Sequence, residues 1–208
     1  IGLIGKNLKY SFSKKYFDKK FKKESLHDFS YELYEINSIE HFKNLLKIKN
    51  LIGLNITSPY KESIIKYTDE LDKTSKRIGV INTIFINQNK SKIIGYNTDA
   101  FGFERSLATF LPKSKIKALV LGSGGASKAV CYVLKKKKIK HLIVSRKPKE
   151  KMISYKESNN YLRDYKLIIN TTILGSGKLK SFFPNINYNL ISKNHYIYDL
   201  IYNPRETL

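Results

Sequence analysis

The stretch IKALVLGSGGASKAV, residues 116–130, decides the fold of the second half of this chain. A predicted buried strand runs into Gly122, Gly124 and Gly125, and a helical pattern follows at once. A glycine turn in this place brings backbone N–H groups against a pyrophosphate at the N-terminus of a helix. Ser127 stands at the third position of the usual glycine pattern. Because the turn lies between a strand and a helix, it predicts a dinucleotide site and not merely a tight structural turn.

The next predicted strand, 140–145, carries the information on which dinucleotide binds. Sites for NAD usually end this strand with Asp or Glu, which accepts hydrogen bonds from the ribose hydroxyls. Here the strand ends in Ser145, Arg146 and Lys147. A guanidinium group forms a bidentate, charge-assisted contact with a phosphate. These residues therefore favour NADP(H), although two basic residues in so basic a chain also have a trivial explanation.

Strands and helices alternate along the whole chain, which is typical of α/β architecture with parallel sheets. Strands are predicted at 1–5, 31–36, 51–56, 80–86, 92–97, 116–121, 140–145, 165–170 and 195–201, and helices at 11–24, 38–46, 60–67, 98–111 and 126–137. A turn at 87–91 joins two of the strands. We expect two domains: an α/β domain over 1–99 and a Rossmann-like, doubly wound domain over 100–208, with the helix 98–111 as connector.

Composition excludes several classes of protein. The 208 residues are 41% hydrophobic, enough to bury a core, and the single cysteine excludes an intrachain disulfide. No apolar run reaches 18 residues, so no membrane role is expected. We expect the protein to be cytoplasmic. The formal charge of +22 invites a nucleic-acid interpretation. Since the lysines are spread over nearly every predicted helix, a solvated basic surface explains the charge better than nucleic-acid binding as a primary role.

Polar residues in the first half gather where predicted strands end. They are Ser11 and Ser13, the stretch LNITSPYK at 54–61, GVINT at 79–83 and GYNTDAFG at 95–102. The crevice of an open α/β sheet lies at such ends, and hydroxyls, an amide and a cation suit a small polyhydroxylated acid. Lys61 and Asp99 are the acid–base candidates there. Each also has a simpler explanation, Lys61 as helix surface and Asp99 as a carboxylate at a helix N-terminus.

These segments, together with SFS at 11–13, LGSGGASKAV, SRK, NTT at 170–172 and YDLIYNPRETL at 198–208, resemble shikimate dehydrogenases in order and spacing. The resemblance covers essentially the whole chain. It implies an oxidoreductase that reduces 3-dehydroshikimate to shikimate with NADPH, in the chorismate pathway to the aromatic amino acids. It also implies a monomer or homodimer that needs no metal.

The resemblance assigns roles residue by residue. Lys61 and Asp99 would form the catalytic pair. The substrate would be bound by Ser11, Ser13, Thr57, Asn82 and Tyr202. The cofactor would be bound by Gly122, Gly124, Gly125, Ala126, Ser145, Arg146, Lys147 and Thr171.

The match departs from the family pattern at the C-terminus. The chain stops at YNPRETL, where the family continues with helices that supply a glutamine to the substrate. We therefore expect a fragment of an active enzyme. Two other interpretations stay open: a homologue that binds nucleotide or substrate without turnover, and a dual-specific dehydrogenase acting on shikimate or quinate.

Overall fold

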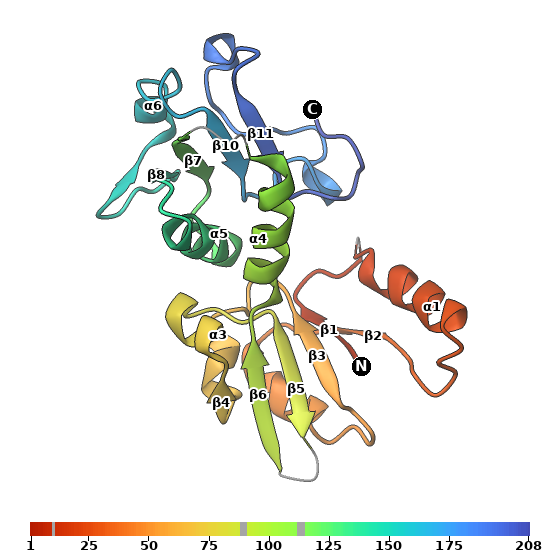
Figure 1. The fold of residues 1–208 in the computed structure, drawn as a ribbon. Helices are drawn as coiled ribbons and strands as arrows, with labels where there is room; N and C mark the ends of the chain where they lie inside the picture. The colour runs from red at the N-terminus through yellow and green to blue at the C-terminus, as the bar shows by residue number, and fades with distance from the viewer. Residues whose placement is uncertain (10, 88–90, 112–114) are drawn as a thin grey trace. The chain divides into compact units, whose positions relative to one another are not determined.

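The computed structural model describes residues 1–9, 11–87, 91–111 and 115–208. The chain divides into two compact units, Ile1–Thr98 and Asp99–Leu208, and each contains one β-sheet (Figure 1). This architecture confirms the predicted α/β fold class.

The first unit is built on a six-stranded sheet with the order β2-β1-β3-β5-β6-β4. Its strands are β1 (Gly2–Gly5), β2 (Glu32–Glu35), β3 (Gly53–Ile56), β4 (Glu70–Leu71), β5 (Thr83–Asn87) and β6 (Lys92–Tyr96). The sheet is mixed, because β5 runs antiparallel to both β3 and β6. The expectation of parallel sheets was wrong for β5, whereas its antiparallel pairing with β6 agrees with the predicted hairpin-like turn between these two strands. Residues 88–90 of the predicted turn lie outside the described residues.

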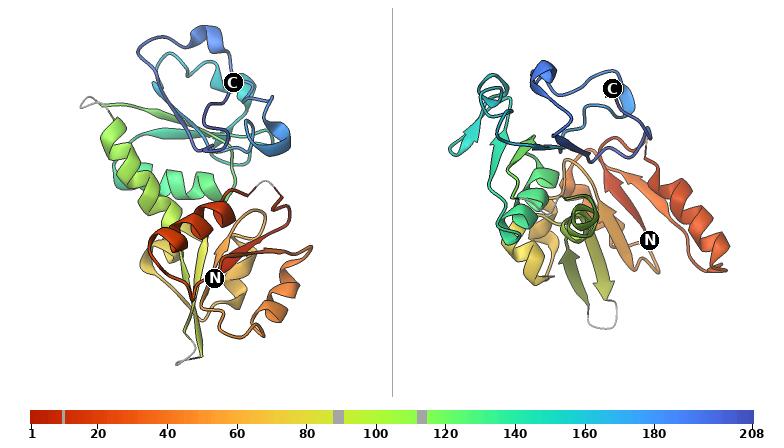
Figure 2. Two further views of the ribbon diagram at one scale, coloured as in Figure 1. Left: turned by 90° about the vertical axis from the view of Figure 1, so that its right-hand side faces the viewer. Right: turned by 45° about the horizontal axis from the view of Figure 1, so that its top comes forward.

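Helices cover the two faces of this sheet. They are α1 (Ser13–Lys23), α2 (Phe42–Leu45) with the 3-10 helix η1 (Ile39–His41) before it, the 3-10 helix η2 (Ser63–Tyr67) and α3 (Lys73–Ile78). Successive residues of β1 point to opposite faces. Leu3 packs in the cluster that includes Phe21 of α1, and Ile4 packs in the larger core with Phe42 and Ile64. Figure 2 shows α1, drawn in red, beside the part of the sheet formed by β1 and β2.

The predicted helix over 60–67 was wrong at its beginning. The chain makes turns through residues 58–62, and the 3-10 helix η2 begins only at Ser63. The carbonyl of Lys61 accepts the backbone N–H of Ile81 at 3.0 Å. The N–H of Ile65 does not donate to this carbonyl, as it would in an α-helix, but to the carbonyl of Glu62 at 3.2 Å, the spacing of a 3-10 turn.

Asp72 caps α3, the helix that leads into the segment 79–83. Its carboxylate accepts the backbone N–H groups of Thr74 and Ser75, each at 2.9 Å. The helix ends at Gly79, whose φ of 70° is left-handed. Burial raises the pKa of Asp72, but the hydrogen bonds from Ser75 and Thr74 outweigh it and hold the pKa below its ordinary value.

Replacing Asp72 by alanine should lower the free energy of unfolding by about 1 kcal/mol, the usual effect of losing an N-cap. Urea unfolding measures the loss, and Asp72→Asn, which keeps a capping oxygen, should recover most of it. Because the folded-state pKa of Asp72 is depressed, its stabilisation is present above the carboxyl range and disappears as pH falls through that range. The difference between wild type and Asp72→Ala should therefore shrink in acid. A difference that grows in acid would contradict this account of the cap.

The second unit is built on a five-stranded parallel sheet with the order β11-β10-β7-β8-β9. Its elements are α4 (Thr98–Phe110), β7 (Ala118–Leu121), α5 (Gly125–Lys136), β8 (His141–Val144), β9 (Met152–Ile153), α6 (Tyr155–Ser158), β10 (Leu167–Asn170), β11 (Tyr196–Asp199) and the 3-10 helices η4 (Gly177–Leu179) and η5 (Tyr188–Leu190). The first residue of α4 belongs to the first unit. This strand order is that of a doubly wound nucleotide-binding fold, in which the order of the parallel strands reverses beside the first strand, here β7.

The predicted strands of this unit occur within two residues of their expected ends. The two-residue strand β9 and the single-turn helix α6 were not predicted, because neither is long enough to show a periodic pattern. Among the described residues, no helix is both long and apolar enough to cross a membrane.

Candidate functional site

In the first unit, the ends of β1, β3 and β6 and the beginning of β5 lie side by side at one edge of the sheet. Because β5 is antiparallel, its first residue lies where β3 and β6 end. The backbone N–H of Thr57 donates to Ile4 at 2.9 Å, and that of Ile56 donates to Asn82 at 2.7 Å. The N–H of Asn82 in turn donates to Tyr96 at 3.0 Å. Segments far apart in the sequence are thus hydrogen-bonded side by side along this edge.

Asn82 is the central polar side chain of this edge. It is only 9% exposed. Its Oδ1 accepts the backbone N–H of Thr98 at 2.8 Å, and its Nδ2 donates to Thr98 Oγ1 at 2.8 Å. A turn residue facing solvent would not be held this way, so Asn82 is more than a turn residue.

Ser11 and Ser13 lie in and just after the loop between β1 and α1, and both are half-buried. The N–H of Ser11 donates to Leu8 at 2.8 Å, and the N–H of Ser13 donates to Ser11 Oγ at 3.3 Å. The loop is tied to β2 by the N–H of Leu8, which donates to Glu35 Oε2 at 2.9 Å. No sequence pattern indicates this role of Glu35, because it depends on β1 and β2 being neighbours.

Lys61 and Asp99 are both half-buried. The backbone of Lys61 is held by its carbonyl, which accepts the N–H of Ile81, the residue directly before Asn82. Asp99 lies in the first turn of α4, directly after Thr98. A carboxylate there is stabilised by the helix dipole. Each residue is thus tied through the backbone to the Asn82 edge.

In the second unit, the glycine turn joins β7 to α5 as predicted. Gly122 has a φ of 111°, a value that favours glycine. Its N–H donates to Val144 of β8 at 2.8 Å. A Cβ atom at Gly122 would lie 2.8 Å from Thr171 Oγ1, so the protein itself requires glycine at this position.

Gly124 is different. It is the N-cap of α5, with an extended backbone that any residue can adopt. Among the described residues, excluding its chain neighbours, no atom would lie within 4 Å of a Cβ built on Gly124. The space in front of the first turn of α5, formed by Gly125 and Ala126, is therefore open. This is the space that a pyrophosphate needs at a helix N-terminus.

The end of β8 lies next to this turn. Ser145 is 6% exposed, and its Oγ lies 3.1 Å from Ser123 Oγ, which links the two loops. Ser145 Oγ also accepts the N–H of Lys147 at 3.2 Å. The side chain of Ser145 thus shapes the turn, while the side chains of Arg146 and Lys147 are exposed.

Thr171 closes the other side of the glycine turn, after β10. Its N–H and its hydroxyl both donate to the carbonyl of Leu121, at 2.9 and 2.7 Å. Because β10, β7 and β8 are neighbours, Thr171, the glycine turn and Arg146 follow adjacent strand ends. Tyr202 follows β11 on the far side of β10 and is 72% exposed.

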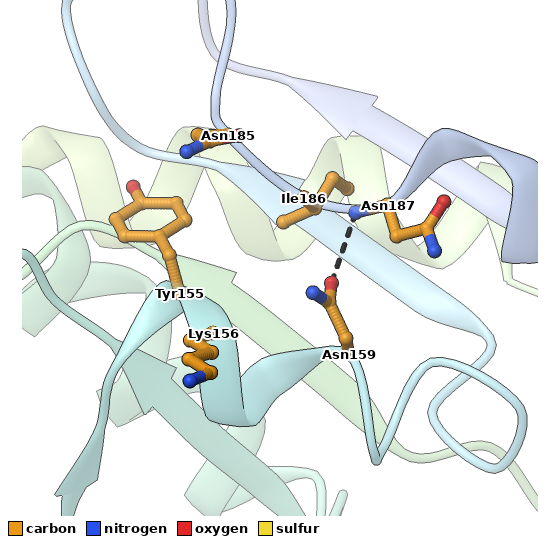
Figure 3. A pocket seen from close by; sticks show the side chains of 6 residues that line it. All are labelled: Tyr155, Lys156, Asn159, Asn185, Ile186 and Asn187. Atoms are coloured by element: carbon orange, nitrogen blue, oxygen red, sulfur yellow. Dashed lines mark hydrogen bonds between the residues drawn. The ribbon is translucent and has the colours of Figure 1, made fainter.

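A pocket of about 270 Å³ lies in the second unit, between α6 and the segment 185–187. Its lining residues are Tyr155, Lys156, Asn159, Asn185, Ile186 and Asn187 (Figure 3). The N–H of Asn187 donates to Asn159 Oδ1 at 2.9 Å and holds the segment against α6. Burial raises the pKa of Tyr155, and the nearby charge of Arg146 opposes that shift. Arg146 itself does not line this pocket, and the sequence did not predict the pocket.

Within the described part of the chain, no three His, Cys, Asp or Glu side chains are grouped to hold a metal ion.

Comparison with known proteins identifies the family. Residues 3–84 match the model of the shikimate dehydrogenase substrate binding domain. A shikimate dehydrogenase (NADP(+)) of Clostridium botulinum is 36% identical over 219 aligned residues, which cover 99% of this chain and 83% of that protein. The chain belongs to the shikimate dehydrogenase family.

Solved structures of shikimate dehydrogenases agree with this assignment. Shikimate dehydrogenase 1 from Peptoclostridium difficile superposes with a TM-score of 0.84 at 32% identity, over 99% of this chain and 78% of that one. The enzyme from Thermus thermophilus, solved in complex with NADP(H) and shikimate, superposes with a TM-score of 0.82 at 28% identity, over 98% and 78%. Both matches extend through the two units, so the family fold is present in each.

Proposed function

We propose that this protein is an NADP-dependent shikimate dehydrogenase that reduces 3-dehydroshikimate to shikimate. The observation that carries the proposal is the identity of 36% across nearly the whole chain with an NADP(+) shikimate dehydrogenase. The arrangement of both units supports it, because each presents polar groups at the sheet edge where an α/β fold binds ligands.

The first unit binds the substrate. Its residues 3–84 match a substrate-binding domain. Ser11 and Ser13, at the start of α1, hold the substrate carboxylate through hydroxyl and backbone N–H groups. Thr57 and Asn82, which are joined through the backbone of Ile56, bind ring hydroxyls. Tyr202, which follows β11, is the remaining residue that the family resemblance assigns to the substrate.

Asp99–Leu208 binds the cofactor. The open space before α5 fits a pyrophosphate, and Gly122, Gly124, Gly125, Ala126 and Thr171 surround it. Ser145 shapes the neighbouring turn so that Arg146 and Lys147 meet the 2′-phosphate of NADP. When bound, NADPH supplies the hydride.

Lys61 and Asp99 carry the acid–base chemistry. Negative charge develops on the ketone oxygen as the carbon beside it is reduced, and the Lys61 ammonium stabilises that charge and delivers a proton. Asp99 orients the ammonium and accepts a hydrogen bond from an adjacent substrate hydroxyl. In this proposal the substrate oxygen lies at Lys61, which follows the end of β3.

The cofactor assignment predicts the effect of removing one cation. Wild type should reduce NADP with shikimate, and Arg146→Ala should raise the KM for NADP by about tenfold, the loss of one charge-assisted contact of roughly 1.5 kcal/mol. The KM for NAD should change little, because NAD has no 2′-phosphate. Absorbance at the nicotinamide band, with each cofactor varied separately, measures both constants.

Lys149→Ala, which removes another exposed cation three residues on, is the control and should leave both constants unchanged. Binding of shikimate or NADP without any reduction by wild type would favour the non-catalytic interpretation. An equal loss with NADP and NAD in Arg146→Ala would contradict the role of the guanidinium.

A further inference from the structure

We infer that Tyr31, a buried residue directly before β2, positions Asn82 for substrate through a relay of side-chain hydrogen bonds. The relay is defined here as Tyr31, Asn55, Thr83 and Asn82. It runs from strand to strand, from Tyr31 beside α1 through β3 and β5 to the candidate substrate edge. The inference rests on the proposed role of Asn82 as a substrate-binding residue and adds positioning residues behind it.

The relay consists of three consecutive contacts. Tyr31 Oη lies 2.8 Å from Asn55 Oδ1. Asn55 Nδ2 lies 3.3 Å from Thr83 Oγ1, its direct partner across the β3–β5 pair. Thr83 Oγ1 then lies 3.2 Å from Asn82 Oδ1.

The direction of these bonds follows from Asn82. The backbone N–H of Thr98 can only donate, so the Asn82 atom 2.8 Å from it must be the amide oxygen. Thr83 can therefore approach that oxygen favourably only by donating its single hydroxyl hydrogen. The oxygen of Thr83 must then accept from Asn55, so Asn55 turns its NH2 group toward Thr83.

Tyr31 completes the order. With its nitrogen facing Thr83, Asn55 presents its oxygen to Tyr31, whose hydroxyl donates to it. Reversing Asn55 would make it accept the Thr83 hydrogen, and two lone pairs would face each other between Thr83 and Asn82 at 3.2 Å. One orientation of each member satisfies all three contacts of the relay. The Tyr31 hydroxyl therefore favours the orientation of Asn55 in which Thr83 donates to Asn82.

The start of the relay is rigid. Tyr31 has no exposed surface, and its ring stacks on Phe17 of α1 with centroids 4.4 Å apart and planes 4° apart. Leu3 and Leu8 pack in the same cluster. Since this packing holds the ring, removing the hydroxyl should leave the ring in place.

Two variants break the relay and one restores it. Tyr31→Phe keeps the ring, Thr83→Val keeps the volume of the side chain, and each removes one hydroxyl. We expect both to raise the KM for shikimate by roughly threefold to tenfold, the size of one lost hydrogen bond, with kcat and the KM for NADP unchanged. Thr83→Ser retains the hydroxyl and should return the KM for shikimate to near the wild-type value.

A matched control separates positioning from stability. Tyr60 is also buried, and its hydroxyl donates to the carbonyl of Ile36 at 2.7 Å outside the relay. Tyr60→Phe should lower the melting temperature about as much as Tyr31→Phe. Only Tyr31→Phe should raise the KM for shikimate.

The outcomes separate this inference from the proposed function. If wild type reduces NADP with shikimate and the relay variants lose only thermal stability, Tyr31 and Thr83 are structural and the inference is overturned. If Thr83→Ser behaves like Thr83→Val, the hydroxyl is not the cause and the inference is again overturned. If wild type neither turns over shikimate nor is stabilised by it, the proposed function fails, and the role of the relay fails with it.

Discussion

Lys61→Ala is expected to lower kcat for shikimate turnover by about 10²–10⁴-fold, the usual contribution of a positioned general acid. The KM for NADP should stay unchanged, because the cofactor contacts assigned above come from the second unit. Asp99→Asn should lower kcat as well, since the amide carries no charge to orient the ammonium. Initial rates at saturating shikimate and NADP measure both effects.

Lys66 supplies the control for charge. It lies five residues after Lys61, and its Nζ binds Glu40 Oε1 at 3.1 Å in an exposed ion pair. That pair and the hydrogen bond from Ser38 lower the pKa of Glu40 to about 2, the Ser38 bond contributing most. Lys66→Ala should leave kcat unchanged. Near-normal turnover by folded Lys61→Ala and Asp99→Asn would remove the chemical basis of the proposed mechanism.

Two glycines of one turn should respond to alanine in opposite ways. Gly124→Ala should raise the KM for NADP about tenfold to a hundredfold, because a methyl group would occupy the space proposed for a pyrophosphate held by charge-assisted hydrogen bonds. Its thermal stability should be unchanged, since its backbone is extended and no described neighbour opposes the methyl group.

Gly122→Ala is the counterpart. Its φ of 111° and the approach of Thr171 Oγ1 should lower the free energy of unfolding by about 1–3 kcal/mol. Cofactor titration followed by nicotinamide fluorescence, together with urea unfolding of both variants, tests the pair. A stability loss in Gly124→Ala that equals the loss in Gly122→Ala would show that the space is not open. An unchanged KM for NADP in folded Gly124→Ala would contradict its role in binding the pyrophosphate.

Local patterns predicted most of the fold. The strand, glycine turn and helix over 116–137 were found because hydrophobic period, glycine placement and helix pattern all agree in one short stretch. The neighbouring strand β10 was recognised because it lies in a continuous apolar run, as strands covered on both faces do. Candidate site residues were found for a related reason, since polar residues directly after such runs are unusual.

Features that depend on distant partners were not predicted. The helix expected from residue 60 was wrong at its beginning, where the carbonyl of Lys61 accepts the N–H of the distant Ile81 and the N–H of Ile65 donates to Glu62. The turn between β5 and β6 was predicted, but the antiparallel pairing of β5 with β3 joins residues far apart in the sequence and was not. The pocket lined by Tyr155 and Ile186 needs α6 and the segment 185–187 together, which lie about 30 residues apart.

The sequence by itself determined the fold class, the family and the residues that carry the proposed chemistry, because each is encoded in short runs of neighbouring residues. Only the tertiary structure decided which of these residues are held in place and by what. Glu35 and Tyr31 show the difference, since both look like ordinary strand residues until β2 pairs with β1 and β3 lies beyond it. A hydrogen bond joins atoms within about 3 Å in space, whereas a sequence pattern records only separation along the chain.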